Sequence, residues 1–210
     1  VLAEMPALRA RHGVFFIAAE VLTGWGRTGT LLACEQAGVV PDILCLSKGI
    51  TGGAVPLAVT MASEAIYEAH LSQDRARMFF HSSSYTANPI ACAAANANLA
   101  IWREEPVRDR IAALAVRQRQ RLDALATHPG FANPRALGTI AAVDIEDRED
   151  AGYLSHRAPA LLAHFRERDL LLRPLGNTVY VMPPYCIDDA DLDRIYAGIA
   201  DAAKATAHPG

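Results

Sequence analysis

The sequence lacks the features that would point to a membrane or to nucleic acid. No apolar run approaches about 18 residues, the length that a membrane-spanning helix needs, and no basic segment followed by an apolar run opens the chain as a secretory leader would. The formal net charge of -3 gives no electrostatic basis for binding nucleic acid or an anionic membrane. We therefore expect a soluble, cytoplasmic protein with neither kind of partner.

Histidine and cysteine are present but not in patterns that bind metals. The 7 histidines are scattered without metal-ligand spacing, so no metal site is expected. The 4 cysteines, Cys34, Cys45, Cys92 and Cys186, lie far apart in apolar surroundings and predict free, buried thiols in a reducing compartment. The chain also opens on a helix tail that runs directly into a strand, so we expect it to be a fragment of a longer protein.

Strands and helices alternate in the first part of the sequence. Val14–Val21 is almost unbroken apolar, as a strand buried on both faces of a parallel sheet should be. Further strands are predicted at 42–47 and 57–61, and helices at 31–37, 62–71, 88–105 and 107–126. This order favours an α/β fold with parallel strand pairs.

The character of the sequence changes after His128–Gly130. A strand is predicted at 139–145, a helix at 155–168, a hairpin around Gly176-Asn177 and a last helix from Asp188 to about Ala205. The sequence thus predicts a larger α/β domain over residues 1–130 and a small α+β domain over residues 131–210.

Lys48 is the first candidate for chemistry. Ligands of open α/β sheets bind beyond the carboxyl ends of the strands, and Lys48 follows a buried strand directly, with Gly49 and Gly52-Gly53 behind it. Desolvation there lowers the pKa of an amine, and a neutral amine can attack a carbonyl. Taken alone, a lysine in this position is more often an ordinary lysine at a strand end.

Gly24–Gly29 matches the dinucleotide fingerprint G-x-G-x-x-G and follows a strand. That reading needs an acidic residue at the end of the second strand to bind a ribose hydroxyl. Here Asp42 opens the second strand and a cation, Lys48, closes it. The pattern therefore disfavours a dinucleotide site.

Two further features could bind a ligand. The loop "FFHSSSYTANP" carries Ser82, Ser83 and Ser84 before a proline-started helix, and could offer hydroxyl and N–H groups to a phosphate or merely cap the helix. Arg173 lies among apolar residues before Pro174. It could be a surface arginine on an edge strand or a bidentate clamp for a carboxylate.

In this order, the pieces resemble the class III aminotransferases, which have the fold-type I architecture. The resemblance covers about Gly13 to Ala203 and rests on "FFIAAEVLTGWGRTGTLLACEQAGVVPDILCLSKGITGG", "HSSSYTANPIACAAANANLAIW" and "LLRPLGNTVYVMPPY". It implies that residues 1–130 are the later part of the large domain that binds pyridoxal 5′-phosphate. Residues 131–210 would be the small domain, so that the chain is the C-terminal half of the enzyme.

The resemblance also implies a role for each candidate residue. Lys48 would hold pyridoxal 5′-phosphate as a Schiff base and move the substrate proton, and Val21 would pack on the cofactor ring. Ser83 and Ser84 would reach the cofactor phosphate of a neighbouring subunit, which implies a homodimer. Ser82, Arg173 and Tyr180 would contact the substrate.

Within the family, the sequence is most similar to members that transfer an amino group from S-adenosylmethionine to 8-amino-7-oxononanoate in biotin biosynthesis. The expected product is 7,8-diaminononanoate. Two other readings are an aminotransferase of the same class that uses ω-amino acids or amines, and a degenerate half that no longer catalyses.

One departure from the family pattern bears on activity. Ala19 stands where the family has an aspartate that keeps the cofactor's pyridine nitrogen protonated. Glu20 cannot easily substitute, because neighbouring side chains of a strand point to opposite faces. The sequence therefore predicts weak cofactor retention and reduced turnover.

Overall fold

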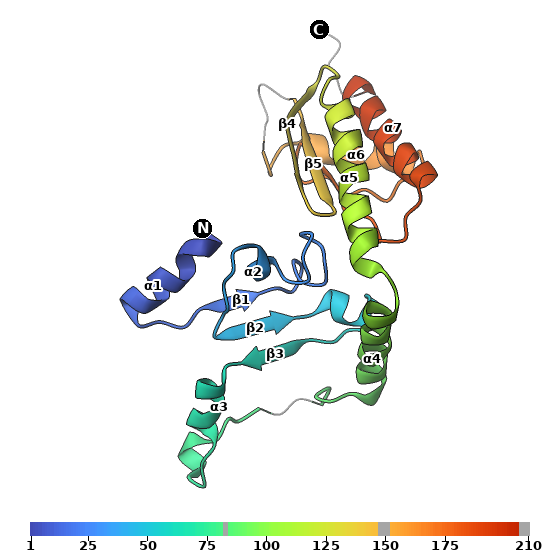
Figure 1. The fold of residues 1–210 in the computed structure, drawn as a ribbon. Coiled ribbons are helices and arrows are strands. Elements are labelled where there is room, and N and C mark those ends of the chain that lie inside the picture. Colours follow the sequence, from blue (N-terminus) through green and yellow to red (C-terminus); the bar gives the residue numbers. More distant parts are fainter. Residues whose placement is uncertain (82–83, 147–151, 206–210) are drawn as a thin grey trace. The chain divides into compact units, whose positions relative to one another are not determined.

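The computed structural model describes residues 1–81, 84–146 and 152–205 (Figure 1). These residues form two compact units, residues 1–108 and 109–210. A domain boundary at 130 in the protein as a whole stays a prediction.

The first unit is built around a sheet in the order β1-β2-β3, with β1 (Ile17–Ala19), β2 (Ile43–Leu46) and β3 (Val59–Ala62). β1 and β2 are parallel, and β2 and β3 are antiparallel. The helices are α1 (Met5–His12), α2 (Ala33–Gln36), α3 (Glu64–His70) and α4 (Pro89–Glu104), with one-turn 3-10 helices at Leu2–Glu4, Lys48–Thr51 and Arg75–Arg77. The α/β fold class expected from the sequence is confirmed.

The start of α4 follows directly from its sequence. Asn88 Oδ1 accepts hydrogen bonds from the backbone N–H groups of Ile90 (3.0 Å) and Ala91 (3.2 Å), and Pro89 occupies the first helical position. Ala95 of α4 is buried in a cluster with Trp25 and Ile50. The capped helix is thereby packed against the segment that follows β2.

Two details of this sheet differ from the expectation. The strand predicted over Val14–Val21 extends only over β1, and Val14 and Phe15 before it are exposed. β3 is antiparallel to β2, because the connection between them, residues 47–58, contains only the one-turn helix Lys48–Thr51 and no crossover helix of the kind that joins parallel strands.

The second unit pairs an antiparallel sheet with helices. The sheet has the order β4-β5-β6, with β4 (Phe131–Leu137), β5 (Ile140–Ile145) and β6 (Thr178–Val181). The helices are α5 (Val107–Leu125), α6 (Arg157–Arg166) and α7 (Asp189–Ala205). Val143, Ile145, Val179 and Val181 share the sheet face that packs into the core with residues of these helices. Figure 1 shows α5 and α7 beside β4 and β5.

The predicted hairpin is confirmed only at its turn. Leu175 and Thr178 form an isolated antiparallel bridge across Gly176-Asn177, but Leu170–Pro174 is not a strand. Pro174 has no N–H group to donate to a partner strand. Strand β4 was not predicted, because Asn133 (φ 50°) and Pro134 break its pattern where the pairing with β5 shifts register.

Candidate active site

Lys48, Ala19 and Val21 come from the same edge of the first sheet. β1 and β2 run parallel, with Ala19 opposite Cys45, so the carboxyl ends of both strands lie at one edge. Ala19 is the last residue of β1, and Lys48 follows the end of β2 by two positions. The edge at which the sequence predicts chemistry therefore exists in the structure.

Lys48 has an unusual backbone conformation. Its φ angle is 48°, in the left-handed region that residues with a side chain rarely adopt. Such a conformation costs on the order of 1 kcal/mol and persists where the surroundings hold it. The side chain is exposed, and among the described residues no hydrogen bond or ion pair engages its amine. The amine is thus available to a ligand.

Three side chains make hydrogen bonds that hold the one-turn helix Lys48–Thr51, which we call the lysine turn. Asn98 of α4 donates from Nδ2 to the carbonyl oxygens of Gly49 (2.9 Å) and Ile50 (3.1 Å). Ser47 Oγ donates to the carbonyl oxygen of Leu57 at 2.7 Å. Thr51 Oγ1 donates to the carbonyl oxygen of Val55 at the same distance, 2.7 Å.

Trp25 of the glycine-rich loop packs on the same turn. A Cβ atom at Gly49 would lie 2.5 Å from Trp25 Cβ, so this position requires glycine. The Trp25 ring, 9% exposed, meets that of Trp102 from α4 edge-on at a centroid distance of 5.6 Å. The loop after β1 and helix α4 therefore both contact the lysine turn.

Position 19, where the resemblance leads us to expect an aspartate, carries no carboxylate. Ala19 is exposed, whereas Glu20 is only 2% exposed. The carboxylate of Glu20 accepts hydrogen bonds from Thr23 Oγ1 and from the N–H groups of Ala33 (3.0 Å) and Cys34 (2.8 Å). Burial alone would raise the pKa of Glu20, but these hydrogen bonds hold that pKa below its ordinary value. The Glu20 carboxylate therefore caps the start of α2.

The glycine-rich loop does not form a dinucleotide site. It leads into α2, a helix of only four residues, Ala33–Gln36, which offers a weak dipole to a pyrophosphate. Asp42 precedes β2, as expected, and its carboxylate accepts a hydrogen bond from Phe16 N (2.8 Å) and pairs with Arg9 (2.6 Å). Asp42 is thus a structural group at the opposite end of the strand from Lys48.

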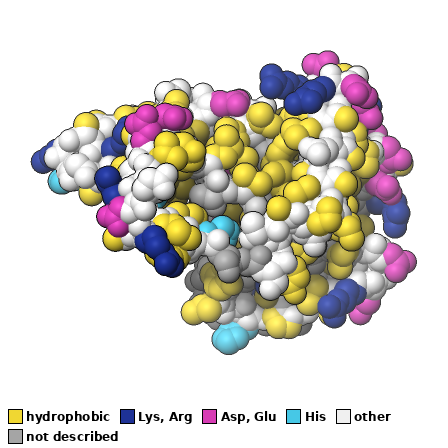
Figure 2. All heavy atoms as spheres, turned by 90° about the horizontal axis from the view of Figure 1, so that it is seen from below, with side chains coloured by type: hydrophobic (Ala, Val, Ile, Leu, Met, Phe, Trp, Pro, Cys, Tyr) yellow, Lys and Arg dark blue, Asp and Glu magenta, His cyan; other side chains and the backbone are white. Residues whose placement is uncertain are grey.

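The predicted phosphate loop is only partly described. Ser82 and Ser83 lie outside the described residues, whereas Ser84 is described and is exposed. Large exposed apolar side chains flank these serines: Phe79 (65%), Phe80 (72%) and Tyr85 (79%). Figure 2, which views the molecule from below, shows hydrophobic side chains widely spread over that face.

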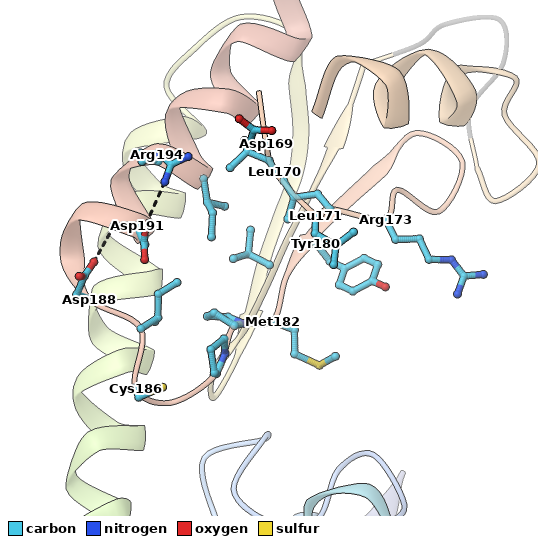
Figure 3. Close-up of a pocket in the computed structure, with 16 residues that line it drawn as sticks. Asp169, Leu170, Leu171, Arg173, Tyr180, Met182, Cys186, Asp188, Asp191 and Arg194 are labelled. Atoms are coloured by element: carbon cyan, nitrogen blue, oxygen red, sulfur yellow. Dashed lines mark hydrogen bonds and ion pairs between the residues drawn. The ribbon is translucent and has the colours of Figure 1, made fainter. Parts of the chain in front are cut away.

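Arg173 and Tyr180 line one cavity in the second unit. The cavity has a volume of about 580 Å³ and lies between Asp169–Arg173, the end of β6 and the start of α7. Leu170, Leu172 and Pro174 are buried, so the alternation of an extended chain turns Arg173 outward. Figure 3 shows Arg173 and Tyr180 projecting away from the ion pair of Arg194 with Asp191. Among the described residues, no hydrogen bond or ion pair engages the Arg173 guanidinium.

Sequence reasoning missed Asn98 and Trp25, which hold the lysine turn. Asn98 lies in helix α4 and Trp25 in the glycine-rich loop. Only their tertiary contacts distinguish them from the other residues of these segments. Among the described residues, no group of three or more His, Cys, Asp or Glu side chains is placed to hold a metal ion. None of the helices described is long and apolar enough to cross a membrane.

Comparisons with known proteins give consistent matches over nearly the whole chain. The family model described as Aminotransferase class-III matches residues 1–203. An adenosylmethionine-8-amino-7-oxononanoate aminotransferase from Synechococcus elongatus is 44% identical over 201 residues, which cover 95% of this chain and 46% of that protein. The chain thus spans about half the length of this curated relative.

The solved structures that this chain resembles are also aminotransferases, and the chain again spans about half of each. The adenosylmethionine-8-amino-7-oxononanoate aminotransferase of Methanocaldococcus jannaschii superposes with a TM-score of 0.88 at 28% identity, over 97% of this chain and 49% of that one. An (S)-enantioselective ω-transaminase from Thermomicrobium roseum superposes with a TM-score of 0.87 at 34% identity, over 96% of this chain and 45% of that one.

Proposed function

This chain belongs to the class III aminotransferases, and we propose from that premise that it carries the lysine of a pyridoxal 5′-phosphate-dependent transaminase. Pyridoxal 5′-phosphate is the cofactor of this family. The single observation that supports the proposal most is the setting of Lys48. This residue follows β2 beside the end of β1, its side chain is exposed, and its backbone is held in a left-handed conformation.

The residues at this edge of the sheet fit the aldehyde and the ring face of the cofactor, but none of them fits its ring nitrogen. Lys48 offers an amine to the cofactor's aldehyde, and half-buried Val21 offers an apolar surface to its ring. Ala19 offers nothing to the ring nitrogen, and Glu20 is already bound by Thr23, Ala33 and Cys34. When bound, the cofactor supplies an electron sink that lets a substrate C–H bond break.

Lys48 would act twice in this scheme. Its Nζ would hold the cofactor through the aldehyde group while no substrate is bound. With substrate present, the free amine would take the proton from the substrate carbon and return it to the reacting system. Both tasks need the amine to stay at one place, which a turn held by the side chains of Asn98, Ser47 and Thr51 supports.

Arg173 and Tyr180 would bind the substrate. A guanidinium without an ion-pair partner among the described residues suits a carboxylate, which it can hold with two parallel hydrogen bonds. Ser82 would contact the substrate, and Ser83 and Ser84 the phosphate of the cofactor on a neighbouring subunit. The exposed aromatic side chains Phe79, Phe80 and Tyr85 supply apolar area for that homodimer contact.

The reaction we propose converts 8-amino-7-oxononanoate to 7,8-diaminononanoate, with S-adenosylmethionine as the amino donor, in biotin biosynthesis. The 44% identical relative from Synechococcus elongatus bears the name of this activity. The donor loses its amino group to the cofactor in one half-reaction, and the ketone of the acceptor receives it in the other. A cytoplasmic location remains a prediction.

A second candidate is a transaminase of ω-amino acids or amines. The similarity to the Thermomicrobium roseum ω-transaminase, 34% identical, favours it. Ala19 favours a third reading, a degenerate member of the family that keeps the fold without turnover. The intact Lys48 and Arg173 argue against the third reading.

An amino-donor screen separates these candidates. The screen uses a longer protein, made by joining the chain to the part of the Synechococcus elongatus relative that it does not span. S-adenosylmethionine is offered in parallel with ω-amino acids and simple amines, and 8-amino-7-oxononanoate is the acceptor. Diamine formation from S-adenosylmethionine alone supports the proposal. Turnover with ω-amino acids or amines in its place favours the second candidate, and no turnover with any donor favours the third.

A further inference from the structure

The carbonyl groups next to Lys48 are bound by a side chain from a distant helix. Asn98 lies in the body of α4, 49 residues from Gly49, and its Nδ2 donates to two consecutive carbonyl oxygens, those of Gly49 and Ile50. The carbonyl oxygen of Lys48 accepts from Gly53 N at 3.2 Å. All three carbonyl groups from Lys48 to Ile50 are therefore engaged.

We propose that Asn98 is a positioning residue for Lys48: its side-chain amide fixes the turn that gives Lys48 its left-handed backbone and aims its amine. Nothing in the sequence singled out Asn98 for this role. The inference rests on the proposed function, because an aimed amine matters only if Lys48 binds the cofactor.

The geometry makes Asn98 the link between the lysine and a rigid element. α4 is capped by Asn88 and buries Ala91 and Ala95, so the backbone that carries Asn98 is fixed. The Cδ1, Cγ and Cβ atoms of Trp25 lie against Gly49 from the glycine-rich loop. The lysine turn is thus held by a polar contact from α4 and by an apolar contact from Trp25.

The left-handed conformation explains why a polar contact is needed. A lysine at φ 48° relaxes to an ordinary conformation unless its neighbours prevent it. Rotation of the Lys48 backbone would move the adjoining peptide groups of Gly49 and Ile50, and both of their carbonyl oxygens are bound by Asn98. Loss of the Asn98 amide would therefore allow the amine to leave its place while α4 and the sheet stay folded.

Three variants test whether the Nδ2 donor of Asn98 holds the lysine turn. Asn98→Asp keeps the size of the side chain but replaces its donor with a carboxylate that faces two carbonyl oxygens. Asn98→Ala removes the side chain beyond Cβ. Asn96→Ala is the matched control, since Asn96 is exposed on the same helix and makes no contact with the lysine turn among the described interactions.

The first readout is amide hydrogen exchange in the turn, followed in the chain itself. The N–H groups of Ile50, Gly52 and Gly53 bond to carbonyl oxygens of the turn. We expect them to exchange roughly tenfold faster in Asn98→Asp and Asn98→Ala than in the unmodified chain. Exchange in Asn96→Ala should match that of the unmodified chain. Unchanged exchange in both Asn98 variants overturns the inference.

The second readout uses the other lysine of the sequence, Lys204, as an internal reference. The chain is treated with pyridoxal phosphate and borohydride, or in parallel with acetic anhydride, and the labelled peptides are quantified. We expect pyridoxal phosphate to label Lys48 in preference to Lys204 in the unmodified chain and in Asn96→Ala. In both Asn98 variants, the ratio of Lys48 label to Lys204 label should fall roughly tenfold. The acetylation ratio of the two lysines should stay the same, because that reagent needs no aimed amine.

The outcomes separate this inference from the proposed function. If the unmodified chain labels Lys48 preferentially and the Asn98 variants do so equally well, Asn98 does not position the lysine. If the unmodified chain shows no preference at all, the proposed function fails, and the exchange rates alone decide whether Asn98 holds the turn. A lower melting temperature with an unchanged labelling preference would reduce Asn98 to a structural role and overturn the inference.

Discussion

Ala19 and Glu20 are adjacent at the end of β1, yet the Ala19 side chain is exposed and that of Glu20 is only 2% exposed. The two side chains therefore face opposite ways, as successive residues of an extended chain do. The carboxylate of Glu20 is bound to Thr23 and to the first turn of α2. It therefore cannot serve in place of a carboxylate at position 19.

A carboxylate introduced at position 19 should raise cofactor retention and turnover. We expect Ala19→Asp to raise cofactor retention and turnover of the longer protein by roughly tenfold or more, because a charge-assisted hydrogen bond contributes about 1.5–3 kcal/mol. Retention is measured by dialysis against buffer, followed by absorbance of the remaining cofactor. Ala18→Asp, on the opposite face, is the control and should give no gain. Equal retention with alanine and aspartate at position 19 would show that the ring nitrogen has another partner.

Glu20 should make the chain sensitive to acid. Its pKa in the folded chain lies below the ordinary value of 4.5, so the stability it contributes is present above that value and is lost as the pH falls through the folded pKa. Glu20→Gln should lower the free energy of unfolding at neutral pH by about 1–3 kcal/mol. The difference from the unmodified chain should shrink below about pH 4.5.

Exposed Glu35 on α2 provides the control for Glu20. Glu35→Gln should change the free energy of unfolding by less than about 0.5 kcal/mol. Urea unfolding of the three proteins across this pH range measures the effect. A difference between Glu20→Gln and the unmodified chain that does not change with pH would contradict the assigned titration.

Gln118 should be the most sensitive polar residue in the core of the second unit. It is fully buried (0% exposed); its Nε2 donates to the carbonyl oxygens of Thr139 (2.8 Å) and Val181 (3.2 Å), and its Oε1 accepts from Tyr196 Oη (2.6 Å). Gln118→Ala leaves these groups without that partner and should cost about 3 kcal/mol. Gln120→Ala, exposed on the same helix, should cost less than about 0.5 kcal/mol. Similar urea midpoints for the two variants would refute this role.

Arg173 should determine affinity for a carboxylate in the longer protein. Arg173→Met should weaken binding of 8-amino-7-oxononanoate by roughly tenfold to a hundredfold, since a hydrogen bond to a charged group contributes about 1.5–3 kcal/mol. Arg173→Lys should recover part of that loss. Arg194→Met, which removes the other guanidinium of the cavity, should leave the KM for the acceptor unchanged. An unchanged KM in Arg173→Met would place the carboxylate elsewhere.

Much of the fold could be predicted from local patterns. The bounds of α4 and α5 follow from the cap at Asn88, from Pro89 and from the apolar spacing after Val107, and the structure confirms them closely. The edge at Lys48 was also predictable, because the carboxyl ends of parallel strands meet. These features depend on residues that are close together in the sequence.

The rest depends on contacts that sequence patterns do not record. β4 includes Asn133-Pro134 at an irregular register, so its local propensity points to a loop. Asn98 resembles any other polar residue of a helix until its contacts with Gly49 and Ile50 are known. The segment before Gly176 reads as a strand by composition, but Pro174 cannot donate a hydrogen bond.

Covalent labelling of Lys48 tests the central claim most directly. The chain and the longer protein are each incubated with pyridoxal phosphate, the visible absorbance of the bound cofactor is recorded, and borohydride reduction is followed by peptide mapping. Lys48 and Lys204 are the only lysines of the chain, so its map gives a clear answer, and in the longer protein their peptides are distinguished by mass from those of the joined part. The account predicts a band in the longer protein with the label on Lys48, and loss of both in Lys48→Ala. A band that survives in Lys48→Ala, or a label divided equally between Lys48 and Lys204, would contradict it.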